Sequence, residues 1–514
     1  MYLGLDSSTQ SLKALLIDSE AGEILSSASV NFTTDLPQYN SPNGVLENKD
    51  PLVKHSNPML WVSALDLVLK RLQDSGQDLS QVLAISGCGQ QHGSVYVTAE
   101  FEDLLKNLHI ENLLVQQLEN GLSRTTSPIW MDSSTSKYCE YLDSKIGNRL
   151  QTDTGSSAIE RFTGVQIRKF FKEDPVGYEK TACIHLVSSF LASILSGHNC
   201  PIDFGDASGM NLLNLKSNEW DAQILEAIAP NLKDKLLPAV ASNSTVGGLH
   251  SYFSKYGLKE GIPIVAWTGD NPSSLIGMGA HKPGTIVISL GTSDTFFAAM
   301  NEFKTDSNGY GHVFGNPAGG SMSLICFKNG SLAREFVKDK YKVDWDYFGK
   351  DALQETDPGN QGNLMLPFIV SEITPLIQKE GVHLVGDHEF CNESAPYSQY
   401  IRAVLETQFQ SMKIHSEWIG EEVSKIRVTG GASESDGICQ VIADIFKCPV
   451  EKINTTDSAA LGGAMRAAEA RSNQTFDELA DKFTKSTQII ESRNKYSATY
   501  NKHNDLVKKA LQNL

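Results

Sequence analysis

One stretch, residues 264–297, constrains the chain more than any other part of its sequence. Its sequence is IVAWTGDNPSSLIGMGAHKPGTIVISLGTSDTFF. The first apolar run ends at Asp270 and Asn271, and Pro272 suits the first turn of a helix, where a missing N–H is harmless. We therefore predict a strand followed by a helix, with a carboxylate and an amide at the junction.

The second half of this stretch predicts a β-hairpin. Two apolar runs flank residues 291–295, GTSDT, a small and hydroxyl-rich turn. Backbone N–H groups exposed by such a turn can cradle a phosphate. Taken alone, each motif is more often an ordinary hairpin or a helix-capping aspartate. Their closeness in the sequence favours a site that combines a carboxylate with bound phosphate.

Composition excludes several classes of protein. The 514 residues are too many for a single core, so we expect two or three domains. A net charge of −17 argues against a nucleic-acid partner or an anionic membrane surface, and any phosphate must be held by local donors and metal. We expect no signal peptide and no membrane span. The eight cysteines include no CxxC pair, which predicts reduced thiols and a cytoplasmic location.

The N-terminus has the same pattern as the predicted hairpin at 285–297: an apolar strand, a hydroxyl-rich turn and a second apolar strand. Residues 2–10, YLGLDSSTQ, are followed by apolar residues 12–18 and by a third expected strand at 24–30. A lone D-x-S-T segment is most simply a β-turn. Two such hairpins in one chain indicate two related domains. Pro238 and the glycine pair in residues 236–248 predict the link, giving domains 1–246 and 247–514.

Polar residues at other predicted turns complete the candidate set. His92 lies in GCGQQHG after an expected strand at 82–86, where α/β sheets usually bind ligands. Arg161 lies beside a turn in ERFTG. A single histidine is more often structural, and an arginine there is more often a surface ion pair. We expect Asp132 to brace a loop and the acidic residues of 202–209 to cap backbone.

A glycine pair lies between a strand and a helix near the C-terminus. Gly430 and Gly431 follow an expected strand at 426–428, so a ligand can approach the backbone while the helix N-terminus faces it. The next expected helix, 458–470, is crowded with alanine and glycine. We expect that helix to serve close packing.

The order of these motifs resembles the FGGY family of carbohydrate kinases over nearly the whole length. The matching segments are YLGLDSSTQSLKALLID, GQQHG, ERFTG, PIDFGDASGMNLL, TGDNPSSL, SLGTSDT, CFKNGSL and TGGAS. The resemblance implies an α/β fold of two actin-like (ribonuclease H-like) ATPase domains, with ATP and sugar in the interdomain cleft. It also implies ATP-dependent phosphorylation of a sugar, with D-xylulose expected.

The resemblance assigns roles by position. Asp270 corresponds to the catalytic base, and Asn271, Arg161 and His92 correspond to sugar contacts. Asp6 matches the carboxylate near the phosphates and Mg²⁺, usually acting through water.

The nucleotide is assigned to a second group of positions. These are Thr9 in the first hairpin, Gly291 and Thr292 in the second, Trp345 as a pocket aromatic, and Gly430 and Gly431 in the adenosine motif. The sequence departs from the family at Ser435, near the place of an Asn in relatives, so no side-chain contact to adenosine is assigned there.

The residues themselves leave alternatives open. Ribulose or another polyol is the nearest competing substrate. An actin- or Hsp70-like ATPase would share the hairpins but would have no use for a polar sugar pocket, so stimulation of ATP turnover by a ketose separates the two. A silent sugar sensor would lack the base position, and Asp270 is present. Whether the chain forms a homodimer is left open.

Overall fold

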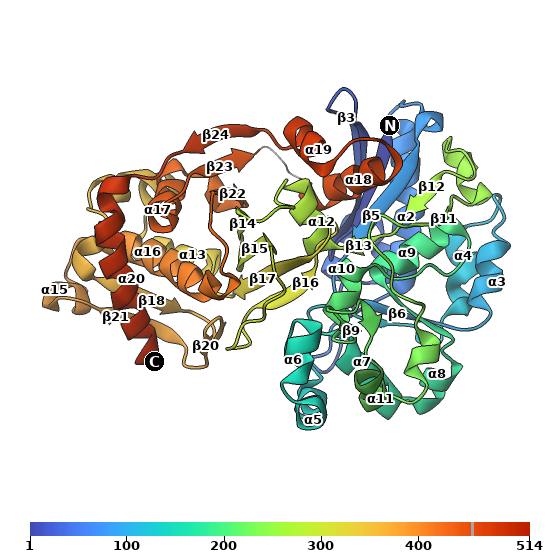
Figure 1. Cartoon of the computed structure of the whole chain (residues 1–514), viewed down its shortest axis with the longest axis horizontal. Coiled ribbons are helices and arrows are strands. Elements are labelled where there is room, and N and C mark those ends of the chain that lie inside the picture. Colours follow the sequence, from blue (N-terminus) through green and yellow to red (C-terminus); the bar gives the residue numbers. More distant parts are fainter. Residues whose placement is uncertain (454–456) are drawn as a thin grey trace. The chain divides into compact units, whose positions relative to one another are not determined.

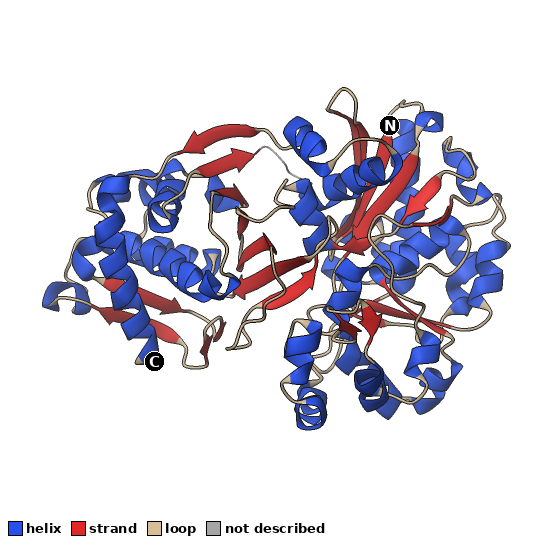
Figure 2. Ribbon diagram, viewed as in Figure 1, coloured by secondary structure: helices blue, strands red, loops and turns tan. Residues whose placement is uncertain are grey.

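The computed structural model describes residues 1–453 and 457–514 and divides into two compact units. Each unit combines a sheet with helices, which Figure 1 labels and Figure 2 colours by type. The first unit comprises Met1–His281, Val313–Ser321 and Thr456–Thr484. The second comprises Lys282–His312, Met322–Thr455 and Lys485–Leu514.

A mixed sheet forms the centre of the first unit. Its strand β1 (Tyr2–Ser7) pairs antiparallel with β2 (Ser11–Asp18) and parallel with β5 (Ala84–Gly89). The strand order is β11-β12-β5-β1-β2-β3, and β13 also pairs with β5. The predicted N-terminal hairpin and third strand are confirmed. The other strands are β3 (Glu23–Asn31), β11 (Thr245–Gly248), β12 (Pro263–Val265) and β13 (Thr268–Gly269).

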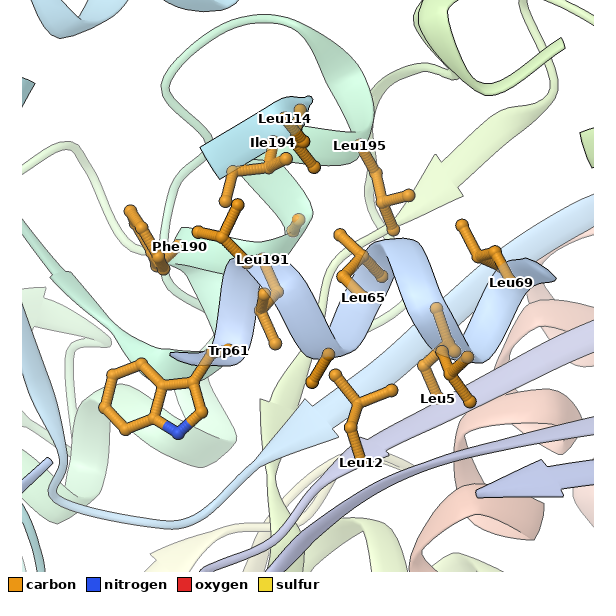
Figure 3. Close-up of a cluster of buried hydrophobic side chains, with 14 of the residues drawn as sticks. Leu5, Leu12, Trp61, Leu65, Leu69, Leu114, Phe190, Leu191, Ile194 and Leu195 are labelled. Carbon is orange, nitrogen blue, oxygen red and sulfur yellow. The ribbon is translucent and has the colours of Figure 1, made fainter. Parts of the chain in front are cut away.

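Helix α2 (Pro58–Asp74) anchors the core of this unit against the sheet. The Asn57 side chain accepts a hydrogen bond from the Met59 N–H at 2.9 Å, and Pro58 occupies the first helical position. The apolar face of α2 contacts the sheet and α9 (Val187–Ser196), as Figure 3 shows. Truncating one of these leucines to alanine is expected to cost about 2–5 kcal/mol. The cluster includes Leu5, Leu12, Trp61, Leu65, Leu69, Leu191 and Leu195.

Helix α18 (Ser458–Arg471) belongs to the first unit although it lies late in the chain. It packs on β1 so closely that a Cβ added at Gly4 would lie 2.0 Å from the Ala460 carbonyl oxygen. A Cβ at Gly277, the last residue of α12 (Asp270–Gly277), would lie 1.9 Å from the Ser458 carbonyl oxygen. The small residues of this helix therefore serve close packing, as predicted.

The division of the chain differs from the predicted domains 1–246 and 247–514. The predicted link near Gly247 is the edge strand β11, which pairs antiparallel with β12. A Cβ at Gly247 would lie 2.5 Å from the His198 ring, so this glycine permits close packing of an edge strand. The first unit continues to His281, and α18 returns to it.

The second unit repeats the plan of the first. Its strand β14 (Thr285–Leu290) pairs antiparallel with β15 (Asp294–Met300) and parallel with β22 (Lys425–Thr429). The sheet runs in the order β17-β15-β14-β22-β23-β24. The predicted second hairpin is thus confirmed. Other strands and helices of this unit include β17 (Ser321–Phe327), β23 (Val450–Ile453), α13 (Ser331–Tyr341), α16 (Tyr397–Ser416) and α17 (Asp436–Phe446).

The C-terminal segment completes the second unit. Its strand β24 (Ser486–Ile490) pairs with β23, and α20 (Ser497–Gln512) packs on α16. The Tyr500 hydroxyl donates to Glu406 Oε1 of α16 at 2.8 Å, deep in the core. Among the described residues, no helix combines the length and apolar character needed to cross a membrane.

Candidate active site

Asp270 is the first residue of α12 (Asp270–Gly277), directly after β13. Its Oδ1 accepts hydrogen bonds from the backbone N–H groups of Asn271 at 2.9 Å and Gln91 at 3.3 Å, and from the Asn271 side-chain amide at 3.0 Å. Burial raises the pKa of Asp270 to about 6, against the lowering effect of these donors. A carboxyl group that titrates near neutrality and is held in one orientation is suited to take a proton from an alcohol.

Gln91 links Asp270 to the turn that carries His92. The Asn271 side-chain amide donates to Gln91 Oε1 at 2.9 Å, so both amides are fixed beside the carboxylate. The Gln91 Nε2 is buried and lacks a hydrogen-bond partner within the described residues. An unpaired buried donor beside a carboxylate favours a polar ligand at this position.

His92 is a neutral, oriented imidazole. Strand β5 extends to Gly89, further than the predicted strand at 82–86, and His92 follows it with a left-handed φ of +70°. Its Nδ1 lies 2.7 Å from the Gly209 carbonyl oxygen, so Nδ1 carries the hydrogen and Nε2 is the acceptor. Burial and then the charge of Arg161 lower the pKa of His92 to about 3. The ring stacks on Phe162 with centroids 4.3 Å apart.

Arg161 lies next to this imidazole. Its guanidinium carbon is 5.7 Å from the centre of the Phe162 ring, on which His92 also stacks. The first unit therefore brings together all the positions predicted to contact sugar. They offer an acceptor nitrogen, a cation, amide groups and a carboxylate, which together match a ligand with several hydroxyl groups.

Asp6 is a second buried carboxyl group near Asp270. It faces Cys88 across the parallel strands β1 and β5, and the Cys88 thiol lies 3.4 Å from Asp6 Oδ1. Burial, and next the charge of Asp270, raise the pKa of Asp6 to about 7. The neighbouring cation, Lys13, forms its ion pair with Asp457 instead. Among the residues that the structure describes, Asp6 therefore has no ion-pair partner.

The turn after β1 holds Thr9. The Ser8 N–H donates to the Ser11 carbonyl oxygen at 3.0 Å and closes the turn. The Trp130 indole N–H donates to Thr9 Oγ1 at 2.8 Å, which orients the hydroxyl. Gly44 lies against this turn, because a Cβ there would be 1.8 Å from the Thr9 carbonyl oxygen.

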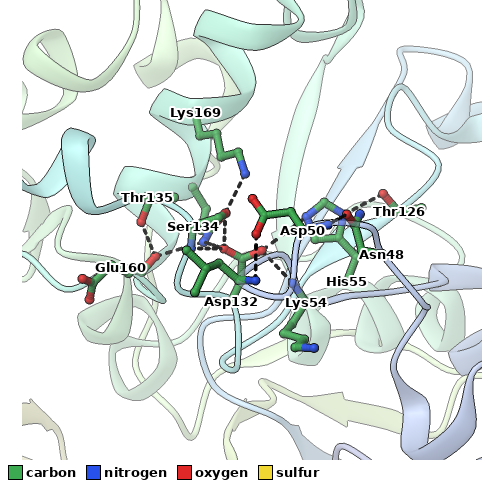
Figure 4. A network of polar contacts seen from close by, with 12 residues as sticks. Asn48, Asp50, Lys54, His55, Thr126, Asp132, Ser134, Thr135, Glu160 and Lys169 are labelled. Atoms are coloured by element: carbon green, nitrogen blue, oxygen red, sulfur yellow. Dashed lines mark hydrogen bonds and ion pairs between the residues drawn. The ribbon is translucent and has the colours of Figure 1, made fainter. Parts of the chain in front are cut away.

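Two further acidic positions have the structural roles that the sequence predicted. Asp132 accepts from the Lys54 N–H at 3.0 Å and the Ser134 hydroxyl at 2.6 Å (Figure 4). It also accepts from the Gln166 amide at 2.8 Å. It therefore braces a loop. Asp203 caps α10 (Phe204–Ala207), because its Oδ1 accepts a hydrogen bond from the Asp206 N–H at 2.8 Å.

Asp206 interacts electrostatically with Asp270, which could not be predicted from the sequence. Burial raises its pKa well above the ordinary value, the Ser188 hydroxyl bond opposes this, and the charges of Asp203 and Asp270 raise it further. Asp206 thus lies within electrostatic reach of the candidate base. A protonated Asp206 leaves the negative charge of this buried cluster on fewer groups.

The turn of the second hairpin lies at the tip of β14 and β15. Thr292 and Ser293 are exposed, whereas Asp294 is buried. The Gly291 carbonyl oxygen accepts the N–H of Ser331 at 2.8 Å, at the start of α13. Contacts to a helix thus support the predicted phosphate turn from behind.

A cavity of about 440 Å³ lies beside the start of α17 in the second unit. Its size suits a small organic ligand. Gly430 adopts a φ of +90°, and a Cβ there would be 2.3 Å from the Leu290 carbonyl oxygen. Beyond Gly431, by contrast, a Cβ would meet no atom within 4 Å. Ser435 caps α17 and donates to the Gly349 carbonyl oxygen at 2.8 Å. The lining residues include Ser331, Glu335, Trp345, Gly431, Ala432, Ser435 and Ile438.

Trp345 gives this cavity an aromatic wall. Its side chain is 46% exposed, which is unusual for so large an apolar group. It packs edge-on against Phe348, with ring centroids 5.3 Å apart. A flat ring left accessible beside a glycine-rich wall can stack on a planar base. The predicted nucleotide positions Trp345, Gly430 and Gly431 thus meet at one place.

Two family models match the chain in succession. The N-terminal domain of the FGGY family of carbohydrate kinases matches residues 120–277, and its C-terminal domain matches residues 286–471. The chain belongs to the FGGY family of carbohydrate kinases. The boundary between the two matched family domains lies between residues 277 and 286. The first segment of the first unit ends in the same interval, at His281.

Curated FGGY relatives are similar over most of the chain. A xylulose kinase from Rattus norvegicus is 44% identical over 479 residues, which cover 90% of this chain and 87% of the relative. Xylulose kinase 2 from Arabidopsis thaliana is 40% identical over 489 residues, covering 91% and 87%.

Solved FGGY kinase structures share the fold. Xylulose kinase from Rhodospirillum rubrum superposes with a TM-score of 0.85 at 16% identity, covering 100% of this chain and 98% of that one. The corresponding protein from Brucella ovis gives a TM-score of 0.82 at 20% identity, covering 99% and 98%. The expected fold class, two actin-like α/β domains, is confirmed. Members of the FGGY family are sugar kinases that use ATP. Membership of this family therefore excludes the alternative of an actin- or Hsp70-like ATPase without a sugar substrate.

The residues around Asp6 fit a magnesium ion. No group of three or more His, Cys, Asp or Glu side chains in the described part of the chain could hold a metal. Magnesium, however, usually takes one or two carboxylates, waters and substrate phosphates. Asp6 supplies such a carboxylate, and burial together with the charge of Asp270 raises its pKa, so that a bound cation would stabilise its ionised form.

Proposed function

We propose that the protein is an ATP-dependent kinase that converts D-xylulose to D-xylulose 5-phosphate. The observation that carries this proposal is the 44% identity to a xylulose kinase over 90% of the chain, combined with the polar cluster around Asp270. Phosphoryl transfer to an alcohol requires a base for the hydroxyl, neutralisation of phosphate charge and alignment of both reactants. The chain contains candidates for each task.

Asp270 takes the proton of the attacking hydroxyl. Three hydrogen bonds to its Oδ1 fix the carboxylate, and a pKa of about 6 leaves it ionised yet basic near neutral pH. His92 accepts a hydroxyl hydrogen at Nε2, and Arg161 and Asn271 donate to hydroxyl oxygens. A site that hydrogen-bonds each hydroxyl rejects a sugar lacking one, because its own groups are left unpaired.

Each unit, taken by itself, offers positions for the nucleotide. In the second unit Gly291 and Thr292 bind phosphate, and Trp345 and Gly431 contact the base end. In the first unit Thr9 lies in a phosphate-binding turn of the same kind. Asp6 would hold Mg²⁺, directly or through water. When bound, the ion neutralises phosphate charge, which the net charge of −17 otherwise repels.

A panel of ketoses and polyols in a coupled ADP-release assay tests this function. We expect low ATP turnover without sugar, strong stimulation by D-xylulose, and weaker stimulation by D-ribulose and by pentitols. Preference for D-ribulose would keep the kinase assignment and overturn the sugar. Sugar-independent ATP turnover would overturn both.

Location and assembly complete the proposal. All eight cysteines are free thiols and most are buried, which is what a cytoplasmic protein would contain. A homodimer stays a prediction, which sedimentation of the purified chain would test.

A further inference from the structure

Behind the second hairpin lies a buried ion pair to which the sequence analysis assigns no role. Arg334 of α13 is 0% exposed and Asp294, the first residue of β15, is 1% exposed. The two guanidinium nitrogens donate to the two carboxylate oxygens at 2.8 and 2.7 Å. This bidentate geometry combines strength with a fixed direction. The carboxylate directly follows the turn Gly291–Ser293.

The surroundings of Arg334 lock it in place. It also donates to the Ser331 hydroxyl at 3.1 Å and to Gln408 Oε1 at 3.3 Å. The Gln408 amide in turn donates to the Gly330 carbonyl oxygen at 3.0 Å. A Cβ at Gly330 would lie 2.6 Å from Asp294 Oδ1, so only glycine fits between helix and carboxylate. This accounts for the glycine of the KNGS segment at 328–331.

The same helix start determines how the turn is oriented. The carbonyl oxygens of Gly291 and Thr292 accept the N–H groups of Ser331 at 2.8 Å and Leu332 at 3.5 Å. In a trans peptide the C=O and the following N–H point in opposite directions. The N–H groups of Thr292 and Ser293 therefore point away from α13. They are two parallel donors at an exposed turn, an arrangement that binds anions.

We propose that Arg334, acting through Asp294, is a positioning residue that fixes the turn Gly291–Ser293 so that its N–H groups meet the phosphates of the nucleotide. This inference rests on the proposed function of the turn. Arg334 itself stays buried in the ion pair and does not touch the nucleotide. Its effect is to hold two donors ready, so that phosphate binding does not have to order the turn.

A second buried ion pair in the same unit provides a matched control. Arg402 and Glu406 of α16 are 2% and 0% exposed, and their side chains meet at 3.0 Å. Arg402 also donates to the Thr356 carbonyl oxygen at 2.8 Å and to the Leu353 carbonyl oxygen at 2.6 Å. These contacts are remote from the turn in the hydrogen-bond network. Removing either arginine leaves a buried carboxylate without its guanidinium partner, which destabilises the protein in both cases.

The experiment compares Arg334→Met, Arg334→Lys, Asp294→Asn and Arg402→Met in the full chain. Melting temperature, ATP affinity by calorimetry without sugar, and KM for ATP and for D-xylulose are measured. We expect Arg334→Met and Asp294→Asn to weaken ATP binding about tenfold, the loss of about one charge-assisted hydrogen bond, with KM for D-xylulose unchanged. Arg334→Lys, which lacks the planar fork, is expected to be intermediate. Arg402→Met lowers the melting temperature and leaves ATP affinity unchanged.

The outcomes separate the inference from the function on which it rests. If the Arg334 and Asp294 variants melt early but bind ATP normally, the ion pair is only structural and the inference is wrong. If the unsubstituted chain binds ATP but does not phosphorylate D-xylulose, the sugar is misassigned, while the calorimetry still tests Arg334. Should Arg334→Met fail to fold, Arg334→Lys and Asp294→Asn decide the question by the same measurements.

Discussion

The hairpins β1–β2 and β14–β15 have the same backbone plan, but the buried carboxylate of each hairpin has a different kind of partner. Each first strand pairs antiparallel with the next strand and parallel with a later one. Asp6 precedes its turn, and its Oδ1 accepts a hydrogen bond from the Cys88 thiol at 3.4 Å. Asp294 follows its turn and is bound at both oxygens by Arg334.

The difference shows how one supersecondary motif serves two tasks. A buried carboxylate without a cation has unsatisfied charge, so it is suited to bind a metal ion or to interact with a substrate. A buried carboxylate already paired with arginine has little capacity for either, and it supports the backbone instead. We therefore expect the first hairpin to contribute a reactive group and the second to contribute an oriented turn.

The largest effect on the rate is expected at Asp270. Like Asp6, it is a buried carboxyl group with a raised pKa. Asp270→Asn keeps the size of the side chain and one acceptor oxygen but removes the charge and the basicity. We expect kcat to fall at least about a hundredfold while the affinity for D-xylulose changes little. Steady-state kinetics with saturating ATP measure this.

The control for this variant is Asp132→Asn. Asp132 is buried and accepts four hydrogen bonds of similar length, but it braces a loop. A smaller rate effect is expected there. Near-normal turnover in Asp270→Asn together with a dead Asp132→Asn would show that the base has been misassigned.

The next largest effect is expected at the sugar contacts. His92→Ala and Arg161→Ala should lower kcat/KM for D-xylulose by about ten- to a hundredfold, because hydroxyl groups lose their partners. ATP binding measured without sugar should survive, in contrast to the Asp294→Asn variant. Normal kinetics in both alanine variants would exclude this cluster as the sugar site.

A third prediction concerns metal dependence. Asp6→Asn should raise the Mg²⁺ concentration that gives half-maximal rate by about tenfold, because one charged ligand is lost. Asp294→Asn should leave this concentration unchanged, since Asp294 is bonded to Arg334. A magnesium titration of both variants at fixed ATP measures it. Equal shifts would mean that the two hairpin carboxylates do not differ in role.

Much of the first hairpin and of the Asp270 region could be predicted from sequence because the signals are local. Alternating apolar runs, a hydroxyl-rich turn and Pro272 after a strand end depend on neighbouring residues. The position of Asp270 at the start of a helix follows from the same signals.

Features that depend on distant contacts could not be predicted. Nothing local in 458–470 indicates that α18 packs on β1, so the division at residue 246 did not match the structure. The pairing of Asp294 with Arg334 and the bond between Gln91 and Asn271 join segments far apart in the chain. Strand β24 is short and mostly exposed, and it is a strand because β23 offers it an edge.

The smallest effect, on stability, gives the sharpest contrast between the hairpins. Burial and Asp270 raise the pKa of Asp6 to about 7, so the folded protein favours the protonated form of Asp6 more than the unfolded chain does. The stability that this provides is fully present below about pH 4 and is lost as the pH rises through about 7. Asp6→Asn, which cannot ionise, should therefore raise the melting temperature at pH 8 by about 2–4 °C, the shift produced by about 1 kcal/mol, and should have no effect at pH 4. Asp294→Asn should lower it at pH 8, because Arg334 loses its partner. Melting curves of both variants without ligands measure this, and destabilisation by Asp6→Asn at pH 8 would mean that Asp6 already has a cationic partner in the protein.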